Sequence, residues 1–376
     1  MATAAGGICS AAEAADWRGP DPYDGLWWSW PAPMTAGPRR RQVLIQLHAR
    51  APLDIRRLYR RSHPRLAKAL ALFGTARARL AERSGSNEDR SWARAALTAL
   101  VQDRSAGTEA WGYPFDTQTR WSFYAAGKPN IVVTGFASVA LQEAAVTLAE
   151  PSFAERAETA ARWMLDALYV PEAGFFAYHP DSTTLIHNAS LLGARAAWRV
   201  LGHDDDGGAR RAVESALDRT LVAQRPDGSF PYGEGSNLQF VDSFHTGFVL
   251  DCLNELKALD TRIPEALERG TAYYVERFFG DDGAARLWPD RPFPEDAHAA
   301  GTALTTLSRL VRGGVAPREL VQRVGRWTSR VLVADGHATC RRHRRGATRV
   351  RYLRWCDAHV AAGLAEAALC LDEPRR

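Results

Sequence analysis

The sequence predicts an all-α protein in which six helical hairpins close into an (α/α)6 toroid, with an inner and an outer ring of helices. Three observations predict this fold. Segments rich in small and apolar residues recur along the chain, a more charged helical segment lies between consecutive members, and long turns rich in Gly, Asp and aromatic residues connect the hairpins. An open superhelical solenoid is the alternative arrangement. Polar and aromatic residues at the starts of the small-residue segments suit one shared cavity and favour the closed ring.

The small-residue segments are expected to form the inner helices. They begin near Thr134, His187, Asp242, Asp296 and Arg354, and the last four starts are separated by 55, 54 and 58 residues. A repeat of this length is typical of stacked helical units. Since Ala, Gly, Ser and Thr allow helices to approach closely, these segments should pack inside.

Segments with more Arg and Glu are expected to form the outer helices, because a charged face suits solvent. They read FAERAETAARWMLDALY, ARRAVESALDRTLVAQ, PEALERGTAYYVERFF and PRELVQRVGRWTSRVLV. A sixth hairpin is expected from residues 52–82 and 90–103, where apolar residues recur with helical period.

The chain of 376 residues contains no Ser/Gly-rich or highly charged linker after about residue 40. We therefore expect residues 41–376 to form a single toroid domain. Residues 1–40 are expected to be an N-terminal extension that docks on this domain through its aromatic DPYDGLWWSW segment, with a disordered extreme N-terminus.

Composition argues against several classes of protein. The net charge is +5, and the Arg-rich runs lack the interleaved aromatic residues of a base-stacking surface, so no nucleic-acid partner is expected. No apolar stretch approaches about 20 residues, and the first residues lack the pattern of a signal peptide. Together with five scattered cysteines, which suggest reduced thiols, this predicts a cytoplasmic protein, and the Arg-rich, Lys-poor composition suggests a GC-rich bacterial genome.

The inner-helix starts carry the candidate catalytic residues. The long turns should all lie at one end of the ring, where they would wall a central funnel. Asp242 and His245 are one helical turn apart at one start, and Asp296 and His298 open the next inner helix. Carboxylate and imidazole groups in a partly desolvated funnel are suited to general acid and base chemistry on a sugar ring. The alternative is a helix-capping Asp and a hydrogen-bonded His.

Substrate-binding candidates lie in the turns and at other helix starts. The WGYPFDTQTRW segment combines aromatic, acidic and basic groups that could stack on a sugar and bind its hydroxyls, although a packed loop is the alternative. Arg354 and Trp355 could bind an anionic group, unless Arg354 forms an internal salt bridge. The full set is Asp24, Trp111, Tyr113, Asp116, Arg120, Trp121, His187, Asn188, Tyr232, Arg354 and Trp355.

No cofactor is expected. Cys340 with His343 and Cys356 with His359 form two C-x2-H units whose spacing superficially matches a zinc site. The second unit should lie on an inner helix and the first in an Arg-rich loop, so coincidence is the better interpretation. Nucleophile-elbow, P-loop and dinucleotide-binding motifs are also absent from the sequence.

Seven segments carry a resemblance to a known group of proteins. They are DPYDGL, PLDIR, WGYPFDTQTRW, DGSFPYG, VDSFHTGFVLDCL, PEDAHAAGTAL and YLRWCDAH. In this order they resemble uncharacterised helical-toroid proteins encoded in bacterial exopolysaccharide and cell-surface glycan clusters. The Gly-aromatic turns also resemble repeats of terpene cyclases and prenyltransferases. The chain departs from the pattern at Ala300 and Gly301, where a glutamine is common, and at Cys356 and His359.

The resemblance implies the toroid fold and a glycan-related pathway. Combined with the candidate acid/base residues, it predicts a saccharide-binding and saccharide-modifying protein of polysaccharide biosynthesis, with lyase, epimerase or hydrolase chemistry in the funnel. A terpene cyclase or prenyltransferase-like enzyme is one alternative, and a noncatalytic glycan-binding or scaffold protein is another. The sequence does not indicate an oligomeric state.

Overall fold

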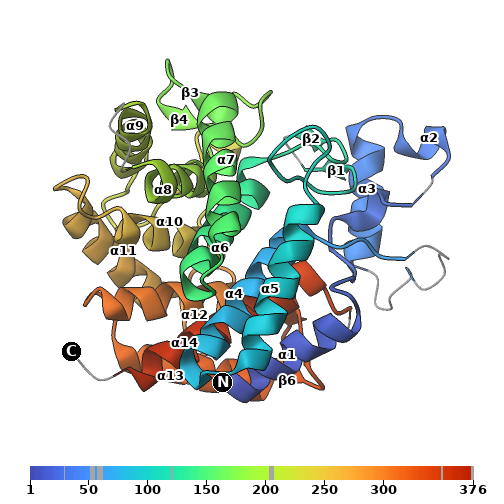
Figure 1. The fold of residues 1–376 in the computed structure, drawn as a ribbon, viewed down its shortest axis with the longest axis vertical. Coiled ribbons are helices and arrows are strands. Elements are labelled where there is room, and N and C mark those ends of the chain that lie inside the picture. The colour runs from blue at the N-terminus through green and yellow to red at the C-terminus, as the bar shows by residue number, and fades with distance from the viewer. Residues whose placement is uncertain are drawn as a thin grey trace.

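Within the described part of the chain, six inner helices form a closed ring. The computed structural model describes residues 1–28, 30–50, 56, 62–119, 122–202, 207–348 and 350–373. Each inner helix packs against the next, and the red α14 packs back against the light-blue α4 (Figure 1). This closure confirms the toroid and excludes the open solenoid. The inner helices are α4 (Ala67–Ser84), α6 (Ile131–Thr147), α8 (His187–Leu201), α10 (Ser243–Glu255), α12 (Ala297–Arg312) and α14 (Ala358–Asp372).

Five outer helices each follow their inner partner and pack against it. In α7, Phe153, Ala157, Ala160 and Met164 recur at helical spacing and are buried, while the Arg and Glu residues face outward. These outer helices are α5 (Asn87–Gln102), α7 (Pro151–Leu168), α9 (Gly208–Val222), α11 (Ile263–Phe278) and α13 (Arg318–Trp327).

The sixth outer position is taken by α1 (Ala2–Ala14), which packs against α14 and α4. The expectation of a disordered extreme N-terminus is therefore wrong. Ala5, Ile8, Cys9 and Ala12 follow the spacing of one helix face and are buried against the inner ring. Most members of this stripe are small, so it gives little hydrophobic signal in the sequence although the fold buries it.

The first inner helix is shorter than expected. Its predicted start at residue 52 lies outside the described residues, as do 51–55 and 57–61, and α4 begins only at Ala67. Pro64 disfavours helical backbone at the residue before it, and Arg65 forms an isolated antiparallel bridge with Arg18. The predicted hairpin thus exists as α4–α5, but its first helix starts later and ends at Ser84, two residues past the predicted end, and its second helix begins at Asn87, three residues before the predicted start.

Short strands and turns connect the helices. Antiparallel pairs join β1 (Thr117–Gln118) to β2 (Phe123–Tyr124), β3 (Tyr169–Val170) to β4 (Phe175–Phe176), β6 (Val333–Ala334) to β7 (His337–Ala338) and β5 (Glu295–Asp296) to β8 (Arg341–Arg342). The β5–β8 pair ties the start of α12 to the loop before α14. The remaining short elements are η1 (Asp24–Leu26), α2 (Ala32–Thr35), α3 (Pro38–Arg50), η3 (Ser236–Leu238), and the π-helical η4 (Thr328–Leu332) and η5 (Leu353–Asp357).

Two glycines set the close approach of α12 and α14. A Cβ at Gly301 would lie 2.4 Å from the carbonyl of His359, and one at Gly363 would lie 2.3 Å from the Gly301 oxygen. Neither contact is tolerable between backbone atoms. The departure at Gly301 from the resembling proteins therefore serves the packing of these two helices.

Charged side chains join the inner helices in their C-terminal halves. Arg79 of α4 contacts Glu143 of α6 at 2.9 Å, and Glu143 contacts Arg199 of α8 at 2.7 Å. Burial alone would raise the pKa of Glu143, but Arg79, Arg199 and Arg309 together hold that pKa well below its usual value. We call this set the ion-pair ring; its other pairs are Arg199–Glu255, Arg195–Asp251, Arg309–Asp251, Arg312–Glu366 and Arg79–Glu366.

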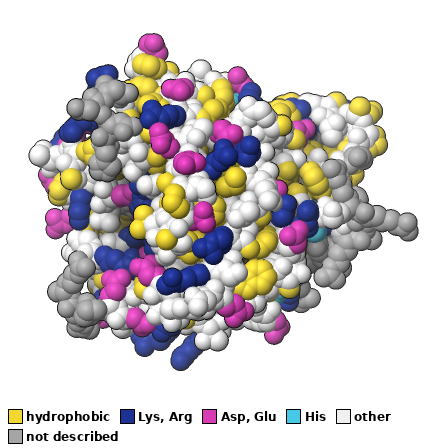
Figure 2. Space-filling model, viewed as in Figure 1, with side chains coloured by type: hydrophobic (Ala, Val, Ile, Leu, Met, Phe, Trp, Pro, Cys, Tyr) yellow, Lys and Arg dark blue, Asp and Glu magenta, His cyan; other side chains and the backbone are white. Residues whose placement is uncertain are grey.

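Charged side chains on the outer surface are arranged differently from those of the ion-pair ring. On the face in Figure 2, basic and acidic side chains are interspersed without a large area of one sign. Within the described residues, no helix is both long and apolar enough to cross a bilayer.

Candidate functional site

Asp242 and His245 form a hydrogen-bonded pair at the start of α10. One carboxylate oxygen of Asp242 accepts the backbone N–H of His245 at 3.0 Å and so caps the helix. The other oxygen accepts a hydrogen bond from Nδ1 of His245 at 2.7 Å. Because a carboxylate only accepts, Nδ1 carries the proton, and Nε2 is left with a lone pair. Asp242 both caps the helix and orients the imidazole.

Aromatic rings surround the His245 imidazole. The ring centroids of Tyr232 and Phe244 lie 4.4 and 4.3 Å from that of His245, and Phe240 lies 6.3 Å away. The His245 side chain is still 22% exposed, whereas that of Asp242 is 4% exposed. The imidazole is therefore partly desolvated but open to a ligand.

A second pair of histidines lies beside this one. His298 of α12 stacks on His359 of α14 with centroids 3.9 Å apart, and on Phe244 at 4.4 Å. Trp355 packs edge-on against His298 at 4.4 Å. Within the described residues, neither ring nitrogen of His298 nor Nε2 of His359 has a hydrogen-bond partner, although both side chains are buried. Buried polar atoms left in this state are rare and indicate a place for water or a ligand.

Lys68, the second residue of α4, completes the group. Its ammonium nitrogen lies 4.1 Å from the centroid of Phe136 and 5.2 Å from that of Phe248. Burial lowers the pKa of Lys68 well below its usual value, and the charge of Arg354 lowers it further. We call the set Lys68, Phe136, Phe244, His245, Phe248, His298, Trp355 and His359 the aromatic–histidine cluster.

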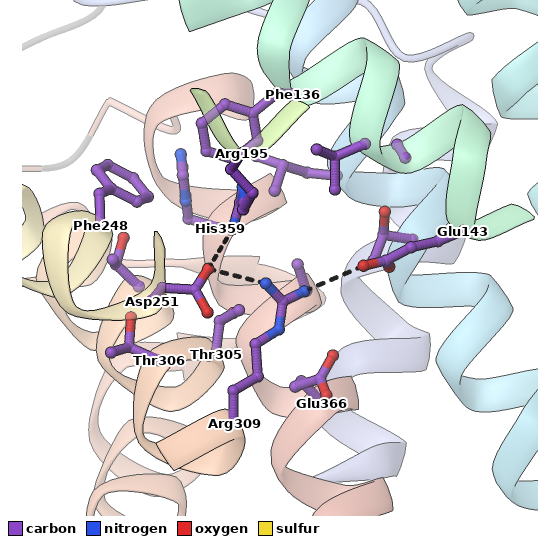
Figure 3. Close-up of a pocket in the computed structure, with 16 residues that line it drawn as sticks. Phe136, Glu143, Arg195, Phe248, Asp251, Thr305, Thr306, Arg309, His359 and Glu366 are labelled. Atoms are coloured by element: carbon purple, nitrogen blue, oxygen red, sulfur yellow. Dashed lines mark hydrogen bonds and ion pairs between the residues drawn. The ribbon is translucent and has the colours of Figure 1, made fainter. Parts of the chain in front are cut away.

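A small cavity of about 50 Å³ adjoins this cluster. Phe136, Phe248 and His359 line one side of it, and Glu143, Asp251, Arg309 and Glu366 of the ion-pair ring line the other (Figure 3). The cluster therefore lies in the first two turns of the inner helices, with the ion-pair ring closing the far side of the cavity.

A more open crevice lies between the N-terminal segment and the loop after α5. Trp27, Arg65, Arg104 and Tyr113 are among its lining residues. Arg65 is paired with Asp103 there. This crevice contains one of the expected ligand-binding residues, Tyr113, but no acid/base pair like Asp242–His245.

Asp296, expected to be catalytic, is occupied by protein partners. It is fully buried, one oxygen accepts the backbone N–H of Ala299, and the other accepts Nε of Arg341 at 2.7 Å. Its neighbour His298 does belong to the aromatic–histidine cluster. Of the two candidate acid/base pairs, only Asp242–His245 forms a direct contact.

Two expected ligand contacts are internal salt bridges. Arg354 donates to both oxygens of Asp21 at 2.6 and 2.9 Å, and its guanidinium lies over the rings of Tyr113 and Trp355. Asp24 is engaged in the same way by the buried guanidinium of Arg56. These pairs fasten residues 21–24 to the body of the protein.

Two described residues of the expected 111–121 segment have protein partners. Trp111 is buried and donates its indole N–H to the Leu100 carbonyl, and Asp116 accepts the backbone N–H of Ala126 in its own loop. Arg120 and Trp121 lie outside the described residues.

The start of α8 carries two more of the expected residues, His187 and Asn188. His187 shares a hydrogen bond with the hydroxyl of Thr220 in the outer helix α9. Asn188 is buried, and its side-chain oxygen has no partner in the described part of the chain. Tyr232 and Trp355 are the two expected binding residues that pack on the histidines.

The suspected zinc ligands do not come together. Cys340 and Cys356 are both buried, but His343 is exposed and His359 lies in the aromatic–histidine cluster. Across the ranges that the structure describes, no three His, Cys, Asp or Glu side chains converge on a possible metal position.

Lys68, Phe136 and Phe248 were missed by sequence reasoning. Phe136 and Phe248 lie in the small-residue inner segments and read as ordinary core residues. A signal for Lys68 was present, since it is one of only three lysines in the chain and opens an inner helix. Reading the sixth hairpin from residue 52 displaced that helix start and hid the lysine.

Neither a family model nor a curated protein matches this sequence. Solved structures do match it over most of its length. A sugar epimerase from a ruminal bacterium has a TM-score of 0.62 at 11% identity, covering 82% of this chain and 88% of that chain. The GH76 α-mannanase of Bacteroides thetaiotaomicron has a TM-score of 0.61 at 11% identity, covering 81% and 86%.

An unsaturated glucuronyl hydrolase from Bacillus sp. GL1 is similar in the same way, with a TM-score of 0.57 at 13% identity and coverage of 78% and 84%. At such low identity the likeness concerns the backbone arrangement. This chain therefore shares the (α/α)6 toroid fold with these three proteins.

Proposed function

We propose that this protein binds a saccharide at the aromatic–histidine cluster and catalyses proton transfer at one of its carbons, with His245 as the base. The observation that carries this proposal is the Asp242–His245 hydrogen bond, which leaves Nε2 with a lone pair among half-buried aromatic rings. Imidazole is suited to proton transfer near neutral pH, and a carboxylate on Nδ1 fixes its tautomer and stabilises the imidazolium that forms. Aromatic rings beside it offer stacking surfaces for the apolar face of a sugar.

The distribution of carboxylates favours epimerase or lyase chemistry over hydrolysis. Glycoside hydrolysis ordinarily uses two carboxyl groups on either side of the bond that breaks. In the described part of the chain, the carboxylate nearest the imidazole of His245 is Asp242, which that imidazole engages, and Asp296 is held by Arg341. Among the described residues the cluster offers imidazole bases without a second free carboxylate, which suits proton abstraction from carbon better than hydrolysis.

The structural neighbours support a saccharide as the ligand. Their names describe a sugar epimerase, an α-mannanase and an unsaturated glucuronyl hydrolase responsible for glycosaminoglycan degradation. A role in polysaccharide biosynthesis and a cytoplasmic location rest on the sequence resemblance and composition, and they complete this proposal.

His298 and His359 argue against the isoprenoid alternative. Cyclisation of an isoprenoid passes through carbocations, which nitrogen bases would deprotonate early, and the two imidazoles place such bases among the aromatic rings. A noncatalytic glycan-binding protein would use the same aromatic surfaces without turnover. The exchange experiment below separates that role from catalysis.

The test is hydrogen exchange at carbon. The protein is incubated in D2O with glucose, mannose, cellobiose and glucuronate, and NMR follows the loss of each C–H signal and any new sugar. We expect exchange in at least one sugar, and a decrease of about 10²- to 10⁴-fold on His245→Ala or Asp242→Asn. His343→Ala, which removes an exposed imidazole, should exchange as the wild type does. Equal exchange in His245→Ala and wild type would remove His245 from the mechanism.

A further inference from the structure

Lys68 is a buried amine without a counter-ion. The residue is 3% exposed, and Asp21, the carboxylate that attracts its charge, is already paired with Arg354. Burial makes the charged form of a lysine unfavourable, and it lowers the pKa of Lys68 well below its usual value. A lysine that only filled space here would be less favourable than Leu or Met, so its amino group requires another explanation.

The charged groups around Lys68 do not explain why a lysine is buried here. The carboxylate that most attracts its charge is Asp21, which already holds Arg354 through two hydrogen bonds. Arg354 itself repels Lys68. Asp242, the next acidic group of the site, is engaged by His245. The protein thus surrounds Lys68 with cationic and neutral groups and with two phenyl rings.

His298 and His359 add unused hydrogen-bonding capacity beside this cation. Both contact Phe248, which also lies under the Lys68 ammonium, and their free ring nitrogens can each donate one N–H once protonated or in the suitable tautomer. Burial lowers the pKa of both imidazoles well below the usual value, and the Lys68 charge contributes to this. An anion placed among these groups would raise the pKa values of both imidazoles again.

The helix arrangement favours negative charge at the same place. Lys68 and His298 are each the second residue of their helices, α4 and α12, whereas His359 follows the π-helical η5 that runs into α14. The positive ends of two helix dipoles therefore lie at the cluster, and partial positive charge at helix starts attracts anions. This field adds to the unpaired lysine and the two unpartnered histidines.

We infer that Lys68, His298 and His359 bind an oxyanion group, such as a carboxylate or phosphate, carried by the saccharide. This deepens the proposed function, because it makes the substrate an acidic sugar. A carboxylate oxygen accepts a charge-assisted hydrogen bond from Lys68, and the imidazoles donate to its remaining lone pairs. A neutral hydroxyl would leave the lysine charge uncompensated. Arg354, the cation that the sequence suggested for this role, is already neutralised by Asp21.

The test compares ligands that differ at one sugar carbon. Isothermal titration calorimetry at pH 7.5 measures binding of glucose, glucuronate, glucose 6-phosphate and inorganic phosphate. We expect one of the two acidic sugars to bind at least about tenfold more tightly than glucose, as one charge-assisted hydrogen bond in a buried site allows. Comparison of the two acidic sugars identifies the carboxylate or the phosphate, and inorganic phosphate shows whether the anion alone suffices.

Lys68→Met provides the variant, and Lys257→Met is its matched control because Lys257 is exposed. Lys68→Met should bind the acidic sugar and glucose with equal affinity, while Lys257→Met keeps the wild-type preference. Thermal melting should show that Lys68→Met is folded and at least as stable as the wild type, since it removes an uncompensated buried charge.

Proton uptake gives an independent readout. Since the pKa values of Lys68, His298 and His359 are lowered in the free protein, an anion should draw protons onto them. Titrations in buffers with different ionisation heats should reveal this uptake in the wild type and less of it in Lys68→Met. Three results would overturn the inference. They are equal affinity of the wild type for glucose and both acidic sugars, an unchanged preference in Lys68→Met, and no binding of any ligand at about 10 mM.

The two proposals can fail separately. Loss of exchange in His245→Ala with no acidic preference in wild type would keep the catalytic proposal and overturn the anion site. Acidic preference that depends on Lys68, without exchange in D2O, would keep the anion site and overturn catalysis.

Discussion

Polar side chains at the inner-helix starts fall into two groups according to their partners. Asp296 and His187 are bonded to Arg341 and Thr220, which belong to the surrounding structure. His298 and Lys68 are equally buried, but in the described structure the His298 ring nitrogens have no hydrogen-bond partner, and the Lys68 ammonium lies against the rings of Phe136 and Phe248. Since a buried polar group without a partner is unfavourable, the second group is where a ligand would contribute most binding energy.

His187 should make the protein sensitive to acid. Burial lowers its pKa from 6.5 to about 4. In the unfolded chain it binds a proton near pH 6.5, so its contribution to stability is fully present above that pH and is lost as pH falls toward 4. Urea unfolding at pH 7 and pH 4.5 should show that His187→Gln loses less stability than wild type, by up to about 3 kcal/mol. An exposed control, His343→Gln, should lose as much as wild type, and an equal loss in His187→Gln would contradict the account.

Each inner helix contributes to the ion-pair ring, which links neighbouring hairpins around the cavity. Arg195 pairs with Asp251, and Arg199 pairs with Glu143 and Glu255, in each case 56 residues away, which is one repeat along the chain. The repeat length therefore sets the partners as well as the helix starts. Because these charges are largely buried, removing one member leaves others uncompensated.

Glu143 tests the importance of the ion-pair ring. Glu143→Gln should lower the free energy of unfolding by about 3 kcal/mol or more, because Arg79, Arg199 and Arg309 lose a shared carboxylate. Glu158→Gln is the matched control, since it removes an exposed partner of Arg162 and should cost less than about 0.5 kcal/mol. Equal effects of both substitutions in urea unfolding would mean that the ring contributes no more than a surface pair.

At the scale of the whole molecule, the repeat made the fold predictable from the sequence. The contacts of single residues could not be predicted in this way. Small-residue segments at a nearly constant interval gave five of the inner helices and the closed ring. The sixth outer helix escaped prediction because α1 comes from the opposite end of the chain, and its buried face is built mostly of small residues. For the site, the Asp242–His245 contact follows from helical spacing. The salt bridges of Asp296 and Arg354 do not follow from helical spacing, because their partners lie far away in the sequence. Arg341 is 45 residues from Asp296, and Asp21 is 333 residues from Arg354.

An acidic saccharide should bind among the starts of the inner helices. A crystal structure of the protein with the preferred acidic sugar would show whether it does. We expect the acidic group within about 3.2 Å of the Lys68 ammonium nitrogen, and a ring carbon facing Nε2 of His245. A sugar bound instead in the crevice lined by Trp27 and Tyr113, with the aromatic–histidine cluster unchanged, would contradict it.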